Sequence, residues 1–288
     1  MLPQLFMNAF SLGSFYALVA LGFSLIFGVT HAFNLAHGEM ILLSGYVAYV
    51  LGKYLEVPFL LTLPVCMLVL LFAAVLLNQL LRRVQAPFEL NSLVVTFGLA
   101  LVLQNGMLIL FSADYRLLKP ASSSLEIPFL HLILTQTQAM LITLSLLATA
   151  TVYVVLRKTF LGKALRATIQ DREAAKLAGI HVGHMSIIAF GIGGGLIGLA
   201  GPLYARTAYL HPFGGTEATL IAIIITIFAG MGHIRGILLG GWTLGFVESL
   251  TIYTLGSNWR ELVSSLLLIA LLLLRPRGFL PERMKSQK

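Results

Sequence analysis

Nine apolar segments follow one another along the chain, and no long polar insertion separates them. They lie at residues 5–28, 35–51, 58–81, 90–111, 132–156, 185–205, 219–231, 237–255 and 262–274. Hydrophobic residues make up 58% of the 288 positions and charged residues 10%, against about 25% charged residues in a soluble domain. Because a chain in hydrocarbon must satisfy its backbone hydrogen bonds internally, these segments predict an all-α polytopic membrane protein. We expect one membrane domain over residues 1–288.

The number of spans depends on the shortest segments. A straight helix needs ~20 residues to cross a ~30 Å hydrocarbon core. Region 219–255 therefore has two readings, two short spans or one span with a re-entrant piece, and the count is eight or nine. Glycine crowds residues 191–201 and 230–245. Such glycines let helix backbones approach closely, and they also permit broken helices that line a cavity.

Lysine and arginine set the expected orientation. They gather at Arg82 and Arg83, over residues 157–176 and over residues 275–288. Basic loops stay in the cytoplasm, so all three belong there, and the less basic loops 112–131 and 206–217 belong outside. Nine spans then place the N-terminus in the periplasm and the C-terminus in the cytoplasm. This use of the basic residues accounts for most of the net charge of +8, and nucleic acid is not expected as a partner.

Residues 157–184 form a polar island in this apolar chain. It concentrates charge and helix-forming residues in one cytoplasmic loop, while the other loops are short. The pattern indicates a docking surface for a soluble partner. The alternative is a solvated basic loop without a partner.

Catalytic motifs are missing from the sequence. It contains no Gly-x-x-x-x-Gly-Lys-Ser/Thr, so the chain is not expected to hydrolyse ATP by itself. The seven histidines include no His-Glu-x-x-His and no acidic partner at metal-ligand spacing. No Gly-x-Ser-x-Gly turn and no carboxylate pair on one helix face is present. We therefore predict no catalytic residue, no metal site and no cofactor on this chain.

Polar residues within the apolar segments are the candidates for a translocation path, because burying them in lipid is costly unless they face a cavity or a partner. The alternative is structural: Asn34 would cap a helix, and Glu39 would hold two helices together. Glu39 and Glu248 are also the carboxylates that an ion-coupled carrier would need. With two glycines of the crowded segment, the candidates are Asn34, His37, Glu39, Gln104, Asn105, Gly193 and Gly194.

Three stretches carry a family resemblance. They read GSFYALVALG at 13–22 with NLAHGE at 34–39, GKALRA at 162–167 with DREAAKLAGI at 171–180, and LRPRGF at 274–279. The sequence resembles the LivH-type permeases of branched-chain amino acid ABC importers over nearly its full length. It departs at residues 229–236, AGMGHIRG, where the family usually repeats small residues with a proline.

The resemblance implies the inner-membrane permease of an ATP-driven importer. Its partners would be two ATP-binding cassette subunits, a second homologous permease and a periplasmic solute-binding protein, with membrane lipid around it. ATP and Mg would be bound by the ATPase subunits. The solute would be a branched-chain or related amino acid, and the alternatives are urea or a short-chain amide, or an autonomous ion-coupled carrier. The implied ATPase-coupling residues are Gly162, Arg166, Asp171, Arg172, Glu173, Ala174, Ala175 and Gly179.

Overall fold

The computed structural model describes residues 2–118, 124–127, 132–230 and 233–274. Its helices are α1 (Leu2–Thr30), α2 (His37–Tyr54), α3 (Phe59–Leu81), α4 (Phe88–Phe111), α5 (Gln136–Lys158), α6 (Phe160–Gln170), α7 (Arg172–Leu177), α8 (Val182–Thr207), α9 (Gly215–Ala229), α10 (Ile234–Thr254) and α11 (Arg260–Leu274). Strands β1 (Ser124–Ile127) and β2 (Leu132–Thr135) form an antiparallel pair. Each of the nine apolar segments contains one helix, and the predicted all-α class is confirmed.

Among the described residues, six helices are long and apolar enough to cross a membrane: α1, α3, α4, α5, α8 and α10. The 219–255 region consists of the short α9 followed by the span-length α10. At 1.5 Å per residue, the 15 residues of α9 rise about 22 Å, less than a ~30 Å hydrocarbon core. α9 is therefore a partial span.

The segment predicted at 132–156 begins too early. Residues 132–135 pair with β1 as strand β2, and α5 starts at Gln136. The reason is local: the Thr135 hydroxyl accepts from the Gln138 backbone N–H, and the Gln138 side chain accepts from the Thr135 N–H. This capping box fixes the first turn of α5 and ends the strand.

Helix α1 lies at the centre of the bundle and packs against α5, α8, α9 and α10. Small residues make this possible. A Cβ at Gly13 would lie 2.7 Å from the Trp242 Cα of α10, and one at Gly245 would lie 2.5 Å from the Gly13 nitrogen. In lipid, such close backbone contact replaces the hydrophobic effect as the force that holds helices together.

The glycines of α8 have the same role. α8 is continuous from Val182 to Thr207, so the alternative of an unwound helix at residues 191–201 is wrong. A Cβ at Gly194 would lie 2.5 Å from the Leu70 carbonyl oxygen of α3, and one at Gly201 would lie 2.3 Å from the Ser44 Cβ of α2. The glycine face therefore seats α8 against both helices.

Helix α2 begins inside the bundle rather than at its surface. After α1, residues 31–36 turn back, and His37 lies beside the middle of α1, with its Nε2 3.1 Å from the Val19 carbonyl oxygen. The N-terminus of α9 meets that of α2 there, since a Cβ at Gly38 would lie 1.7 Å from the Gly215 carbonyl oxygen. The N-terminal ends of α2 and α9 thus face each other within the bundle.

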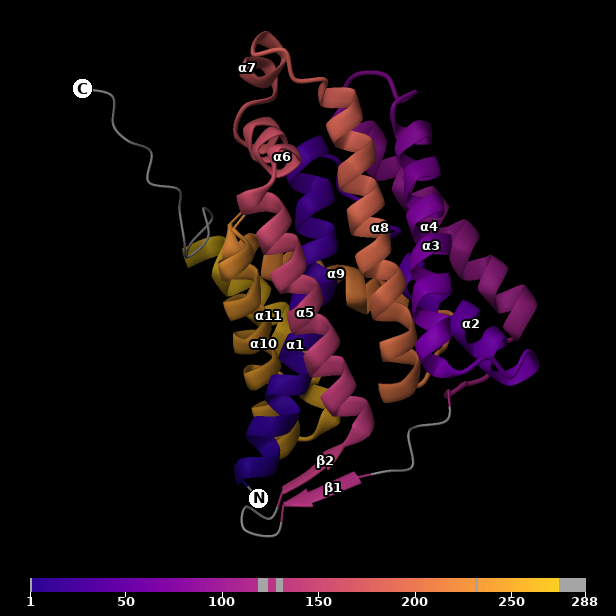
Figure 1. The fold of residues 1–288 in the computed structure, drawn as a ribbon. Helices are drawn as coiled ribbons and strands as arrows, with labels where there is room; N and C mark the ends of the chain where they lie inside the picture. Colours follow the sequence, from indigo (N-terminus) through magenta and orange to yellow (C-terminus); the bar gives the residue numbers. More distant parts are fainter. Residues whose placement is uncertain (1, 119–123, 128–131, 231–232, 275–288) are drawn as a thin grey trace.

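The two ends of the bundle differ. In Figure 1, α6 and α7 project from one end, and the N-terminus and the β1–β2 pair lie at the other. Arg82 and Arg172 line one pocket, so two of the basic segments share the α6–α7 end. The loops predicted to lie outside meet at the opposite end, where Arg116 pairs with Leu210. The third basic segment, 275–288, lies outside the described residues.

Candidate functional site

A cavity of about 710 Å³ lies among α1, α5, α8, α9 and α10. Gln4 and Asn8 of α1 and Gln138 of α5 line it at the N-terminal end of the bundle, where Gln138 Nε2 donates to Asn8 Oδ1 at 3.1 Å. Much of the wall is apolar and aromatic, with side chains that include Leu5, Leu12, Phe15, Leu141, Tyr204, Ile221 and Ile252. The volume is within the range of small-molecule sites.

Charged side chains enter the cavity wall from three places. Arg206 comes from the end of α8, Glu217 from the first turn of α9 and Arg260 from the start of α11. The Arg206 guanidinium lies 3.6 Å from the centre of the Phe59 ring, and its buried Nε has no hydrogen-bond partner among the described residues. The cavity therefore combines a large apolar surface with groups of both charges.

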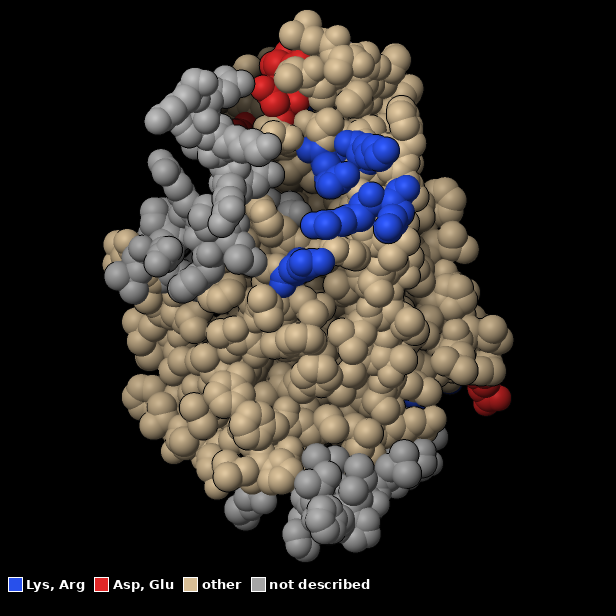
Figure 2. Space-filling model, turned by 60° about the vertical axis from the view of Figure 1, so that its left-hand side comes forward, with Lys and Arg blue, Asp and Glu red and all other residues tan. Residues whose placement is uncertain are grey.

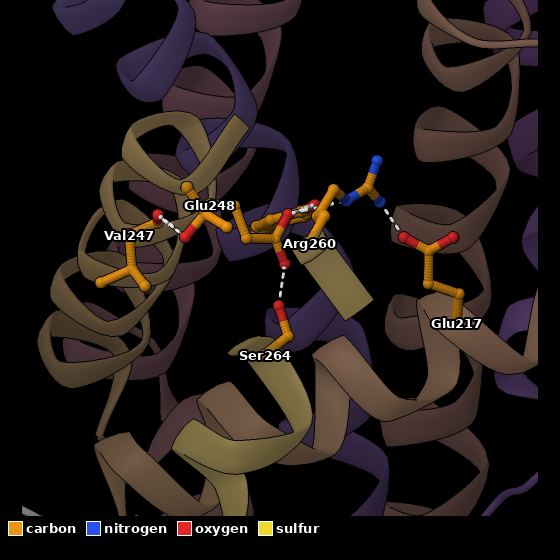
Figure 3. A network of polar contacts seen from close by, with 7 residues as sticks. Glu217, Val247, Glu248, Arg260 and Ser264 are labelled. Atoms are coloured by element: carbon orange, nitrogen blue, oxygen red, sulfur yellow. Dashed lines mark hydrogen bonds and ion pairs between the residues drawn. The ribbon is translucent and has the colours of Figure 1, made fainter. Parts of the chain in front are cut away.

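Arg260 belongs to a buried network that Figure 3 shows from close by. Its Nε lies 3.0 Å from Glu248 Oε2 of α10, and its Nη2 contacts Glu217 of α9. Glu248 is 1% exposed and also accepts from the Tyr16 hydroxyl of α1 and the Ser264 hydroxyl of α11, both at 2.5 Å. A carboxylate at this depth is tolerated because two hydroxyl donors and a guanidinium group surround it. The network joins α1, α9, α10 and α11 beside the cavity.

The sequence prediction missed most of this site. It considered Glu248 as a polar group within a span and as a carboxylate for an ion-coupled carrier, and it did not identify Arg206, Glu217 or Arg260. Their signal was present, since each is a charged residue within three positions of an expected span. The pairing of Glu248 with Arg260 could not be predicted from their positions in the sequence alone.

The predicted path residues lie elsewhere, and none of the seven lines this cavity. Asn34 Oδ1 accepts from the Ala36 N–H just before α2. The Glu39 carboxyl group lies against Gly215 at the start of α9, and its buried Oε2 has no hydrogen-bond partner among the described residues. With His37 beside Val19, these residues surround the junction of α2 and α9.

The other four candidates lie on two helices. Gln104 and Asn105 belong to α4, which is largely exposed, and Asn105 Nδ2 donates to the Leu101 carbonyl oxygen of its own helix at 2.8 Å. Gly193 packs against Ile26 of α1, and Gly194 against α3. The structure thus brings together Asn34, His37 and Glu39 but not the seven as one group.

The predicted coupling segment folds into α6 and α7, which connect α5 to α8. Gly162 permits the tight turn into α6, because a Cβ there would lie 2.2 Å from the Val155 carbonyl oxygen. Arg166 is exposed on α6. Phe160 and Leu177 are 87% and 91% exposed, so two large apolar side chains point away from the bundle.

Helix α7 has well-defined ends. The Asp171 carboxylate accepts from the backbone N–H groups of Glu173 and Ala174, which caps the first turn. Gly179 takes φ +82°, and Ile180 N–H donates to the Ala175 carbonyl oxygen, as in a Schellman motif. Of the remaining predicted residues, Ala175 is buried and Arg172 donates to the Thr30 carbonyl oxygen.

Charge is distributed unevenly over the surface. On the face in Figure 2, lysine and arginine side chains gather towards the α6–α7 end, acidic side chains lie beyond them, and the middle of the face is tan. Exposed basic residues of this end include Arg157, Lys158 and Lys163. A basic border beside an uncharged belt is the pattern expected at a cytoplasmic membrane surface.

Comparison with known proteins identifies the family. Residues 5–272 match the family described as the permease component of the branched-chain amino acid transport system. The chain belongs to this family. It is 27% identical to the high-affinity branched-chain amino acid transport permease LivH of Salmonella typhimurium, over 97% of the chain and 95% of that protein. The corresponding permease BraD of Pseudomonas aeruginosa is 26% identical, over 96% and 95%.

A solved structure supports the fold. The PsaBC structure from Streptococcus pneumoniae in complex with Fab superposes with a TM-score of 0.52 at 12% identity, covering 94% of this chain and 91% of that one. With the family match and the apolar helices, it shows that this permease component is a multi-pass membrane protein. The suspected LivH-type membership is confirmed.

Proposed function

We propose that this chain is the translocation subunit of an ATP-driven importer for branched-chain or related amino acids in the bacterial inner membrane. It acts with two ATP-binding cassette subunits, a second homologous permease and a periplasmic solute-binding protein. ATP and Mg are handled by the ATPase subunits, and this chain binds no cofactor. The N-terminus is periplasmic, and the C-terminus is cytoplasmic.

One arrangement carries the proposal: α5 and α8 both line the cavity at one end, and α6–α7 joins them at the other. Thr137 and Leu141 of α5 and Tyr204 and Arg206 of α8 are in the cavity wall. A partner that moves α6–α7 would therefore tilt two walls of the cavity together. Such rigid-body motion of helices can alternate the access of a binding site between two sides.

The cavity wall favours an amino acid over urea. A zwitterion with an apolar side chain needs a cation, an anion and an apolar surface, and Arg206, Glu217 and the leucine and isoleucine side chains provide them. Urea carries no net charge and would leave Arg206, whose Nε has no hydrogen-bond partner among the described residues, without a charged partner. The names of the relatives agree with this preference, since LivH and BraD are branched-chain amino acid permeases.

The seven path residues remain part of the proposal in three places. Asn34, His37 and Glu39 surround the α2–α9 junction, where a pathway from the cavity towards the α6–α7 end would pass. Gln104 and Asn105 lie on α4, and a second permease packed against α4 would bring them to a shared path. Gly193 and Gly194 keep α8 close to α1 and α3.

Uptake by the complete complex in proteoliposomes tests the proposal. We expect ATP-dependent uptake of leucine and no saturable uptake of urea, with a KM for leucine raised at least about tenfold in Glu217→Gln, because one ionic contact is lost. Arg235→Gln is the matched control, since Arg235 donates to Tyr153 and does not line the cavity. Uptake that follows an ion gradient without ATP, and that stops in Glu39→Gln with Glu248→Gln, would instead support the carrier.

A further inference from the structure

A second pocket, of about 360 Å³, lies at the α6–α7 end of the bundle. It is enclosed by the ends of α1 and α3, the turn into α4, helix α7 and the first turns of α8. It shares no lining residue with the larger cavity. The described part of the chain therefore contains a polar site that the transport proposal does not use.

The charge of this pocket is positive. Arg82, Arg172 and Lys176 line it, and no acidic side chain of the described residues does. Arg82 and Arg172 form no ion pair among the described residues, and Lys176 is paired with Glu173 on the exposed surface of α7. Three cations around one small pocket repel one another unless an anion lies between them.

The backbone adds to this charge. α8 starts at Val182 with no side-chain hydrogen bond at its N-cap, and Gly183 lies in the pocket wall. The Arg82 guanidinium lies directly over this turn, since a Cβ at Gly183 would be 3.2 Å from Arg82 Nη2. The free N–H groups and the dipole of a 26-residue helix attract anions at this end.

A buried donor supplies the independent indication. Asn78 lines the pocket and is 1% exposed. Its Oδ1 accepts from the Ser186 hydroxyl at 2.5 Å, but its Nδ2 is buried and has no hydrogen-bond partner among the described residues. Because a buried amide N–H without an acceptor is costly, Asn78 requires an acceptor that a bound anion would provide.

We propose that this pocket binds a phosphate group. Phosphate has the charge for three cations and enough oxygens to accept from Asn78 Nδ2, a guanidinium fork and a helix N-terminus together. Its source is a free phosphate compound or the headgroup of an anionic phospholipid. Because Arg172 and Lys176 belong to α7 and the other groups to α3 and α8, the bound phosphate braces α7 against the bundle.

The test uses the full-length purified chain in phosphatidylcholine nanodiscs. Inorganic phosphate is titrated against chloride at equal ionic strength, and the midpoint of thermal unfolding is followed, since a ligand of the folded state raises it. In a second arm, the discs contain phosphatidylglycerol, and the lipid retained after detergent extraction is identified by native mass spectrometry. Stabilisation by inorganic phosphate indicates a free phosphate compound, and retention of phosphatidylglycerol alone indicates a headgroup.

Matched variants test whether phosphate binds in this pocket. Arg82→Gln with Arg172→Gln should weaken binding at least about tenfold, whereas Arg83→Gln with Arg166→Gln removes the same charge outside the pocket and should bind as the wild type does. Asn78→Asp keeps the acceptor for Ser186 and replaces the free donor by a carboxylate, so it should also lose binding. If neither phosphate nor phosphatidylglycerol affects the wild-type chain, or if all variants respond equally, the proposal is wrong.

Discussion

The Glu248 network allows a quantitative prediction about stability. Glu248→Ala removes the acceptor of the Tyr16 and Ser264 hydroxyls and the ion-pair partner of Arg260, at a site that is 1% exposed. The buried Tyr16 and Ser264 hydroxyls then have no acceptor, which costs about 1–3 kcal/mol each, or about 2–6 kcal/mol together, whereas Arg260 is 31% exposed and keeps its contact with Glu217. Glu217→Ala removes the outer contact of Arg260, where the glutamate is 32% exposed, and should cost about 1 kcal/mol or less.

Thermal unfolding of the purified chain in nanodiscs, followed by size-exclusion chromatography, measures this difference. At about 2 °C per kcal/mol, Glu248→Ala should lower the midpoint by about 4–12 °C and Glu217→Ala by about 2 °C or less. Glu248→Gln, which keeps an acceptor and loses the charge, should fall between them. Equal midpoints for Glu248→Ala and Glu217→Ala would refute the reasoning that Glu248 holds α1, α10 and α11 together.

Three further predictions concern α2 and α7. Gly38→Ala should abolish recovery of monodisperse protein, because its Cβ would meet the Gly215 carbonyl oxygen at 1.7 Å, whereas Gly98→Ala, with no atom within 4 Å of the new Cβ, should be recovered as the wild type is. Glu173→Arg or Gly179→Asp should uncouple uptake from ATP while sparing membrane insertion. Gly179 is sensitive because its φ of +82° is a backbone conformation that favours glycine. Wild-type uptake together with normal ATPase binding in either variant would contradict the docking role. Leu177→Glu should reduce co-purification of the ATPase subunits without changing the unfolding midpoint, since Leu177 is 91% exposed, and equal recovery of ATPase would exclude this side chain from the contact.

Local structure could be predicted where a signal lies within a few residues. The DREAAKLAG stretch contains both an N-cap aspartate and a C-terminal glycine, and α7 forms between them. The glycine spacing of α8 predicted close packing, and Gly194, Gly198 and Gly201 each touch a neighbouring helix. These features depend on the backbone of one segment, so one sequence is sufficient to find them.

Contacts between distant segments could not be predicted in the same way. Tyr16 and Glu248 are 232 positions apart, and no periodicity connects them. Spans such as α4 are apolar on all sides, so their sequence does not tell which face meets lipid and which meets protein. For the same reason the cavity wall, assembled from six helices, was missed. The start of α5 at Gln136 was also missed, because it depends on a side-chain cap at Thr135.

The meeting of α2 and α9 has a consequence for biogenesis. α9 is too short to span a bilayer by itself. Its N-terminal part is held by an earlier part of the chain, because the Gly38 N–H donates to the Thr219 hydroxyl across 181 positions. We therefore expect the long spans to partition into lipid during synthesis, and α2 and α9 to pack against each other afterwards. Limited proteolysis of a chain truncated after residue 214 tests this order. The protease should cleave α2 in the truncated chain, whereas α2 should be protected in the full chain. The α2–α9 junction is then the last part to fold, although α2 is among the first parts of the chain to be made.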